Sequence, residues 1–413
     1  RDLEQMTNTA INKYRLSAHC TDDSNWLDYA LIILIIGLTG FQFCFRSRFG
    51  IFFLVGPLAA YMFKIRNRRI YPNQMLFLGL LVWEFFQVQT GQSTSSAMGN
   101  FYIRFIVYLI AASSINEFED VYVKTIYIIA IISLPFWAIS NYLPGGYDLL
   151  RIFPEFYING IGMDEISNTN PGYSIGFYYV AKSIRNSGPF WEPGMYVVFL
   201  VLAYSIHLLK HREPFDKISI VLLLAIVTTF STTGYCAIFI PLILYYTILD
   251  FKPRSLLVLV LIGICVFLFL NSDFGMSKIA DNSKNTNAYS RFGAVTYHFT
   301  LLQKYLLTGR GFASEDNNVL LTSPNGITMI LLFWGVLFGA YYYYLLYVSS
   351  KKIAYESAGE SRGIYTLLIF SVLIIVAFSQ DITTRHFYYF LLMYGLTPTL
   401  KNHEESEAIH YPS

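Results

Sequence analysis

Apolar residues occur along this chain in long blocks separated by short polar segments, without the alternation typical of a soluble domain. A helix that crosses a bilayer needs roughly 20 mostly apolar residues. We therefore predict an all-α polytopic membrane protein in which residues 1–413 form a single integral membrane domain. The twelve predicted spans are residues 27–45, 49–63, 74–89, 101–115, 122–141, 194–209, 217–232, 233–249, 255–271, 322–347, 363–380 and 385–400.

Basic residues at the ends of these spans indicate their orientation, because short cytoplasmic loops are enriched in Lys and Arg. When twelve spans alternate, four basic segments share one side, namely Lys64–Arg69, Lys210–Lys217, Asp250–Arg254 and Lys351–Arg362. We predict that this side and both termini are cytoplasmic, although Arg46 and Arg48 fall on the other side. Two long loops, at about 142–193 and 272–321, then lie outside. Loops of this length in a compact bundle are usually functional, and their aromatic content disfavours a disordered ectodomain.

The composition supports a lipid-embedded chain and excludes several classes of function. Charged residues make up only 14% of the 413 residues, against about 25% in a soluble domain. A net charge of +2 gives no indication of nucleic-acid binding. The four cysteines lack a CxxC spacing, so neither a disulfide framework nor a thiolate metal site is predicted. Walker, Rossmann, HExxH and GxSxG motifs are also absent from the sequence, so no cofactor is predicted.

The first long loop ends in the segment Arg185–Gly194, which runs directly into an apolar span. The planar guanidinium of Arg185 is suited to phosphate oxygens. Pro189 and Pro193 predict a shaped bend before the helix begins. The segment therefore predicts either an anion-binding loop or a structural clamp in which Arg185 pairs with Glu192.

The second long loop contains apolar residues at three- and four-residue steps, which predict an amphipathic helix at the membrane surface. Arg291, His298 and Tyr305 are seven apart and would border its apolar face. The helix would present Arg291 and His298 to a lipid phosphate, or its polar rim would simply be solvated. A turn at Gly309–Gly311 would bring Arg310 to the same place.

Other polar positions have plainer interpretations. Glu315 and Asp316 lack the further oxygen ligands of a metal site, and no metal is predicted. The small residues Ser231–Gly234 predict a close approach of two helices. Glu84 and Arg104, inside spans, are expected to form an ion pair, and the same interpretation applies to Asp381 and Arg385.

Several of these pieces together resemble the O-antigen and exopolysaccharide polymerases of the Wzy type, within the wider O-antigen ligase superfamily. The resemblance covers residues 185–345 in order. It rests on Arg185–Gly194 opening a span, Ser231–Gly234 between spans, Ser290–Phe292 continuing to Leu307–Phe312, then Asn318, Gly326 and Gly335. It implies a GT-C-like helical fold in a bacterial inner membrane.

The resemblance also implies a reaction, in which a growing glycan is transferred from an undecaprenyl-diphosphate carrier onto a lipid-linked repeat unit at the periplasmic face. Neither a nucleotide sugar nor a metal is expected. Arg185 and Arg291 would bind the diphosphate, with Arg310 as a helper. The expected partners are the lipid-linked glycan, the bilayer and a chain-length regulator, but no nucleic acid.

One departure from the superfamily concerns the general base. Its members often carry a His just before the span that begins here near Val319, where this chain has Asp316–Asn318. The candidates for the catalytic base are therefore His298 and Glu192. Two other functions remain open: a ligase that transfers finished glycan to lipid A core, and a transporter or flippase without bond chemistry. A membrane scaffold is a third, which leaves the loop arginines unexplained.

Overall fold

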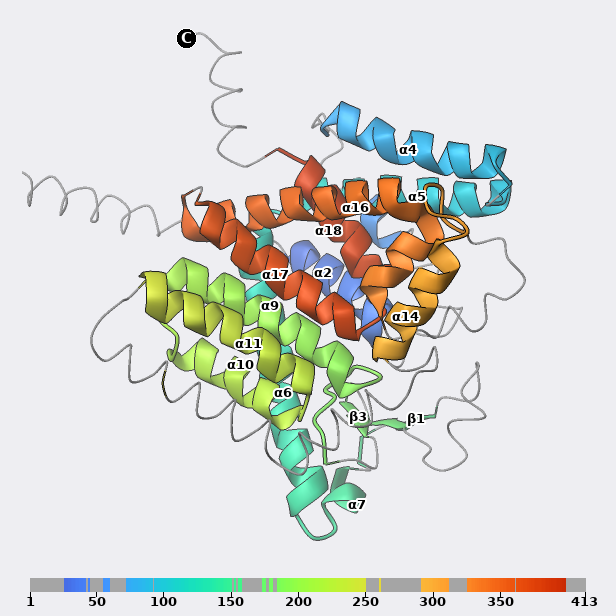
Figure 1. Cartoon of the computed structure of the whole chain (residues 1–413). Helices are drawn as coiled ribbons and strands as arrows, with labels where there is room; N and C mark the ends of the chain where they lie inside the picture. The colour runs from blue at the N-terminus through green and yellow to red at the C-terminus, as the bar shows by residue number, and fades with distance from the viewer. Residues whose placement is uncertain are drawn as a thin grey trace, which may run out of the picture.

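A computed structural model of the chain shows a bundle of helices with a small sheet at one end (Figure 1). It describes residues 26–41, 44, 55–59, 72–91, 93–150, 152–153, 155–157, 173–175, 178–180, 184–249, 260, 291–311, 325–360 and 362–398. A helix occupies every predicted span except 49–63 and 255–271, which lie mostly outside the described residues. The prediction of a helical membrane protein is confirmed in outline, whereas the count of twelve spans stays a prediction.

The bundle is built from α2 (Trp26–Gly40), α4 (Gln74–Gln89), α5 (Ser95–Ser114), α6 (Phe118–Tyr142), α9 (Pro193–His211), α10 (Lys217–Thr228), α11 (Thr232–Leu244) with the π-helical turn η4 (Tyr245–Leu249), α16 (Gly326–Ala358), α17 (Gly363–Ser379) and α18 (His386–Leu396). Two further helices, α7 (Gly146–Leu150) and α14 (Arg291–Leu302), lie within the two long loops. The first loop also carries an antiparallel sheet that the sequence did not predict. Its order is β1 (Glu155–Tyr157), β2 (Tyr173–Ile175), β3 (Tyr178–Val180), with Glu155 opposite Ile175 and Tyr173 opposite Val180.

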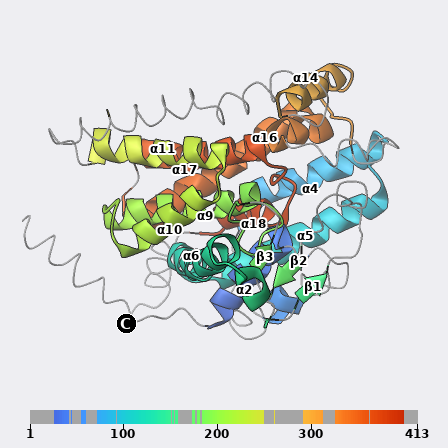
Figure 2. The same ribbon diagram turned by 90° about the horizontal axis from the view of Figure 1, so that it is seen from below.

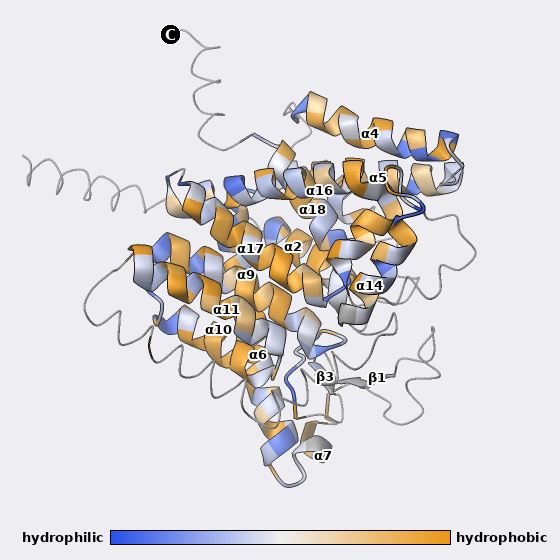
Figure 3. Cartoon of the chain, viewed as in Figure 1, coloured by the Kyte–Doolittle hydropathy of each residue, from blue (hydrophilic) through white to orange (hydrophobic). Residues whose placement is uncertain are grey.

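Five stretches of helix among the described residues are long and apolar enough to cross a membrane, namely Ser95–Ser114, Phe118–Tyr142, Pro193–His211, Thr232–Leu249 and Gly326–Ala358. Three shorter helices, α2, α10 and α17, are also apolar. Hydrophobic residues cover the helices along most of their length, and hydrophilic residues gather near their ends (Figure 3). This distribution is what a bilayer requires of a polytopic helical protein.

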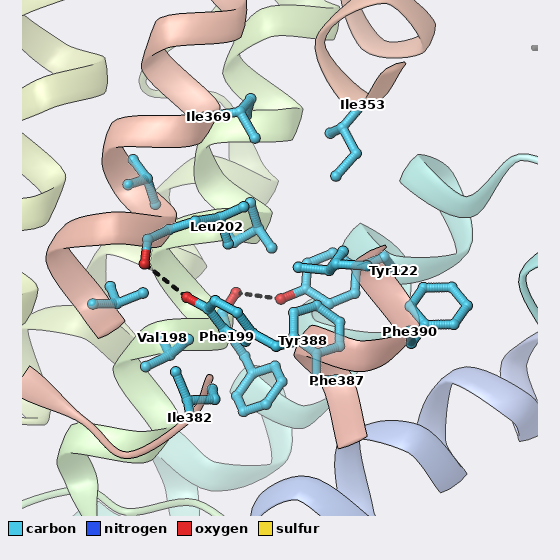
Figure 4. Packing of buried hydrophobic residues seen from close by; sticks show 14 of the residues in the cluster. Tyr122, Val198, Phe199, Leu202, Ile353, Ile369, Ile382, Phe387, Tyr388 and Phe390 are labelled. Carbon is cyan, nitrogen blue, oxygen red and sulfur yellow. Dashed lines mark hydrogen bonds between the residues drawn. The ribbon is translucent and has the colours of Figure 1, made fainter. Parts of the chain in front are cut away.

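The centre of the bundle is α9, whose residues from Pro193 to Leu209 are all buried. Seen from below, α9 and α18 lie between α11 and α17 on one side and α2 and α6 on the other (Figure 2). Aromatic packing joins the layers: Tyr122 of α6 stacks on Phe387 of α18 at 5.5 Å, and its hydroxyl donates to Phe199 O of α9 (Figure 4). A buried hydroxyl needs such a partner, and the backbone carbonyl supplies it.

Helix starts follow local sequence signals. Asn73, Thr94, Asp216, Ser231 and Asn325 cap α4, α5, α10, α11 and α16, each side chain accepting from a backbone N–H three residues on. The Ser231–Gly234 motif also serves the predicted close approach. A Cβ at Gly234 would lie 2.3 Å from Val197 Cγ2 of α9, so only glycine fits there.

Two of the predicted cytoplasmic segments meet at one end of the bundle. Arg212, which follows α9, pairs with Glu360 beyond α16 at 3.1 Å, and Lys210 pairs with Asp120 of α6. Arg212 and Glu360 thus meet at one end of the bundle, as their predicted common side requires, while the topology itself stays a prediction. The sheet, the Arg185 segment and the turn between α17 and α18 lie at the opposite end, which we call the site end.

Candidate functional site

The segment Arg185–Glu192 is fixed to the site end by buried hydrogen bonds. Asn186 is fully buried, and its amide donates to Ser133 Oγ at 3.3 Å and to Thr228 Oγ1 at 3.0 Å. Its Oδ1 accepts from the N–H of Gly188, which has φ of 54°. The Arg185 Nε donates to Thr229 O at 3.0 Å. The predicted bend is thus a built loop, held by α6 on one side and by the end of α10 on the other.

Glu192 caps the N-terminus of α9, where the backbone begins to turn helical. It has φ of −151° and ψ of 155°, and its carbonyl accepts from the N–H groups of Met195 and Tyr196. Its side chain makes no capping bond and is only half-buried. A carboxylate at a helix N-terminus is favoured by the helix dipole. Glu192 is therefore placed at the site end, at the start of α9.

The turn after α17 brings the starts of α9 and α16 together. A Cβ at Gly194 would lie 2.2 Å from Gln380 Nε2, and one at Gly326 would lie 2.7 Å from Gln380 O. The Thr383 hydroxyl donates to Gly326 O at 2.8 Å. Both helices thus begin against residues 380–383, and two glycines make that contact possible.

His298 lies on α14 and faces the first turn of α16. Its ring is 1% exposed, and Nδ1 lies 2.7 Å from Thr328 Oγ1. Nε2 has no hydrogen-bond partner among the described residues. Burial lowers the pKa of His298 to about 4, so the imidazole is neutral at neutral pH. A neutral ring with one nitrogen held and the other open has the form of a general base.

The structure corrects the predicted orientation of this helix. The buried side of α14 carries Ala294, His298 and Leu302, whereas Phe299 is 49% exposed. The helix ends at Leu302, so Tyr305 does not continue the stripe. His298, which was predicted to face a lipid phosphate, is instead buried in the protein, and of the predicted apolar residues Leu302 is buried whereas Phe299 is exposed.

The Gly309–Gly311 segment is paired with a break in α16. At Gly335 the backbone has φ of 77° and ψ of 175°, a conformation essentially restricted to glycine. The Arg310 N–H donates to Leu332 O at 2.7 Å and the Gly311 N–H to Phe333 O at 2.9 Å. On the other side of the break, the Val336 N–H donates to Leu306 O at 2.9 Å. The segment therefore takes up the carbonyls that the interrupted helix leaves open.

His298 and Arg310 are consequently brought to the same short piece of helix, residues 326–334. His298 contacts Thr328 near its start, and Arg310 contacts Leu332 near its end. At 1.5 Å per residue these two contacts are about 6 Å apart along the axis. Arg291 begins α14 on the same side, but its side chain is outside the described residues. Arg185 and His298 both lie at the site end, Arg185 bonded to Thr229 beyond α10 and His298 to Thr328 of α16.

The expected ion pair between Glu84 and Arg104 is not formed. Arg104 lies over the Tyr389 ring at 6.0 Å, and both carboxyl oxygens of Glu84 are buried without a hydrogen-bond partner among the described residues. Asp381 and Arg385 do pair, at 3.5 Å. Burial raises the pKa of Asp381, which the Arg385 guanidinium offsets in part. This pair adds a further arginine, Arg385, to the site end, close in sequence to Gln380.

An apolar cavity of about 210 Å³ opens beside the Arg185 segment. Pro189 and Ser133 form its inner wall, and Ile33, Ile128 and Ile132, all about half exposed, form its open side. Its remaining lining residues are Phe41, Ile129 and Tyr178. The cavity thus runs from the lipid-facing surface of α2 and α6 to the loop that carries Arg185.

Sequence reasoning missed Thr328, Gln380, Asn186 and Gln87, which hold the predicted residues in place. Thr328 and Gln380 carry no motif, since their role depends on which helix ends meet. Asn186 lies within the segment Arg185–Gly194, and a polar side chain directly before an apolar span is a signal that could have indicated its structural role. The acidic and amide residues 315–318 lie outside the described residues.

Comparison with known proteins identifies no relative: no family model, curated protein or solved structure matches this chain. What the fold defines is the class, a helical membrane protein with a polar site at one end of its bundle.

Proposed function

We propose that this protein polymerises lipid-linked oligosaccharide repeat units, transferring glycan from a polyprenyl diphosphate carrier at the periplasmic face of a bacterial inner membrane. The observation that carries the proposal is the joint anchoring of His298 and Arg310 on residues 326–334 of α16. A neutral base and the backbone of an arginine are thereby brought to one short piece of helix. The resemblance to Wzy-type polymerases supplies the substrate class.

In the proposed step, an acceptor sugar hydroxyl attacks the anomeric carbon of the donor glycan. The new glycosidic C–O bond forms as the bond to the carrier diphosphate breaks, and the diphosphate leaves with the electron pair. His298 Nε2 takes the hydroxyl proton, while Thr328 accepts from Nδ1–H and fixes the tautomer. Bound diphosphate raises the pKa of the nearby ring and strengthens the base. Glu192 is the second candidate for this role.

Arginines bind the leaving diphosphate in this proposal. Arg185 and Arg310 are both half-buried at the site end, where a guanidinium contact with phosphate is stronger than in water. Arg291 is the first residue of α14. Val295 follows it after four residues and His298 after seven. The cavity beside Arg185 suits the hydrocarbon chain of the carrier, because it is apolar and open to the lipid side.

The twelve-span topology belongs to this proposal. Reporter fusions after Asn168 and Asn285 are expected to be periplasmic, and fusions after Arg212 and Arg254 cytoplasmic. A cytoplasmic result at Asn285 would place the α14 segment on the wrong side for periplasmic transfer.

A flippase is a second candidate, because the broken helix α16 and the buried Glu84 are features that transporters use. Cells that lack the chain distinguish the functions. Loss of a polymerase leaves acceptors decorated with single repeats. Loss of a ligase leaves acceptors bare while long lipid-linked chains accumulate, and loss of a flippase traps single repeats in the cytoplasmic leaflet.

A further inference from the structure

Helix α4 directs two polar residues inward and several apolar residues outward. Its buried residues are Leu80, Glu84 and Gln87, whereas Met75 and Val82 are more than half exposed. A helix in lipid is free to have this arrangement, because its outward face contacts hydrocarbon. The two buried polar residues are three apart and share a face. That face packs against the break in α16.

Gln87 joins the two sides of the Gly309–Gly311 pairing. Its Nε2 donates to Thr308 O at 2.9 Å and to Phe333 O at 3.0 Å, and the side chain is fully buried. Two carbonyl acceptors fix the orientation of the amide, since only the NH₂ group is able to donate. Phe333 O also accepts from the Gly311 N–H. One side chain of α4 therefore holds both the broken helix and the segment that crosses it.

Arg310 is two residues from Thr308, so its Cα lies within about 7 Å along the chain. The flanking glycines, with φ of 74° and 72°, give this segment little stiffness of its own. External bonds must therefore set its position. The backbone hydrogen bond from Arg310 to Leu332 fixes the position of Arg310 itself. The hydrogen bond from Gln87 to Thr308 fixes the residue two positions before it.

Glu84 precedes Gln87 by about one turn. Neither its two oxygens nor Gln87 Oε1 has a hydrogen-bond partner among the described residues. Burial of a carboxyl without such partners is costly.

We propose that Gln87 is a positioning residue for Arg310, which it holds at the site of the carrier diphosphate through Thr308. The proposal rests on the proposed function of Arg310 as a diphosphate ligand. The proposal gives α4 a part in substrate binding, although its sequence carries no recognisable motif.

The test measures binding of inorganic pyrophosphate to the full chain in lipid nanodiscs. Gln87→Met keeps the length of the side chain and removes both donated bonds, and we expect binding to weaken about tenfold. Gln89→Met, at an exposed position on the same helix, is the matched control and should bind normally. In an Arg310→Ala background, Gln87→Met should cause no further loss, because its effect acts through Arg310. Losses that multiply would overturn the proposal.

Gln87→Glu provides a second variant in case the first folds poorly. The introduced glutamate would donate one hydrogen bond when neutral and none when ionised. The affinity of the Gln87→Glu variant for pyrophosphate, divided by that of the wild type at the same pH, should therefore fall as the pH rises. A flat ratio contradicts the positioning role. If Arg310→Ala weakens binding but both Gln87 variants bind normally, only this inference fails. If the wild type does not bind pyrophosphate, or Arg310→Ala has no effect, the proposed function of Arg310 fails with it.

Discussion

His298 and Thr328 lie on helices α14 and α16, and the imidazole Nδ1 of one is 2.7 Å from the hydroxyl of the other. The contact leaves Nε2 without a partner among the described residues, in a side chain that is 1% exposed. A buried polar atom without a partner is costly, and such atoms in native proteins often mark a place where a ligand completes the site.

Substitution of this pair separates the base from its support. His298→Ala should lower the rate of transfer by about 100- to 10,000-fold, the usual effect of losing a general base. Thr328→Val retains the shape and removes one hydrogen bond, so the rate should fall only about tenfold. Rates are compared at equal protein abundance. Full activity in His298→Ala, together with a large loss in Glu192→Gln, would assign the base to Glu192.

The acid limb of activity should lie well below the ordinary titration of histidine. Burial lowers the pKa of His298 to about 4 in the folded free protein, against 6.5 as its ordinary value. The rate at low substrate concentration, kcat/KM, should therefore stay level from pH 7 to about 5 and fall nearer pH 4. An acid limb near pH 6.5 contradicts the buried state of this ring.

The same shift affects stability with a definite sign. Between pH 6.5 and 4 the unfolded chain binds a proton at His298 that the folded chain refuses, so the free energy of unfolding decreases as the pH falls through this range. The pH dependence should be smaller in His298→Gln. Its thermal unfolding measured at pH 7 and pH 5 in the same detergent gives the comparison.

The break in α16 should be intolerant of side chains. Gly335→Ala and Gly309→Ala place a Cβ 2.2 Å from Leu307 O and 2.3 Å from Phe333 O, at φ of 77° and 74°. Gly359 has φ of 70° but nothing within 4 Å, so Gly359→Ala carries the backbone strain alone. We expect a loss of roughly 1 kcal/mol for Gly359→Ala and a clearly larger drop in Tm for the other two. Equal melting temperatures would show that the pairing is not rigid.

Much of the fold follows from the apolar blocks, because lipid permits only helices of sufficient length to span it. The break at Gly335 could not be predicted from these blocks, because a glycine inside an apolar segment carries no local sequence signal for a kink. It becomes visible only with the segment Gly309–Gly311, which lies about 25 residues earlier in the chain.

Local periodicity also misplaced His298. The steps of Phe299 and Leu302 predicted one apolar face on the membrane surface with His298 at its border, but Phe299 is exposed while His298 is buried between Ala294 and Leu302 on the inward side. In a membrane protein both faces of a helix are apolar in part, so periodicity alone does not tell which of them is inward. The bend around Arg185 could be predicted because polar residues and two prolines interrupt an otherwise apolar chain, whereas its role in binding stays a prediction.

The arginines should contribute through the shape of their guanidinium groups. Arg185→Ala and Arg310→Ala each remove a charge-assisted contact worth roughly 1.5–3 kcal/mol, so the rate of transfer should fall about ten- to a hundredfold. Lysine at either position should restore only part of the activity, because its ammonium lacks the planar fork. Arg362, which is exposed at the opposite end, provides the control as Arg362→Ala. Wild-type rates in an alanine variant would remove that arginine from the site.

The central claim is tested most directly with purified protein and lipid-linked repeat units as the only substrate. Because the sequence carries no nucleotide-binding or zinc-protease motif, we expect a ladder of longer glycans on the carrier in the presence of EDTA and without any nucleotide sugar. Gel separation of the labelled glycan reads out the ladder, and the His298→Ala variant should leave single repeats. No ladder from active wild-type preparations, with transfer of preformed long glycan to lipid A core instead, would contradict polymerisation and establish a ligase.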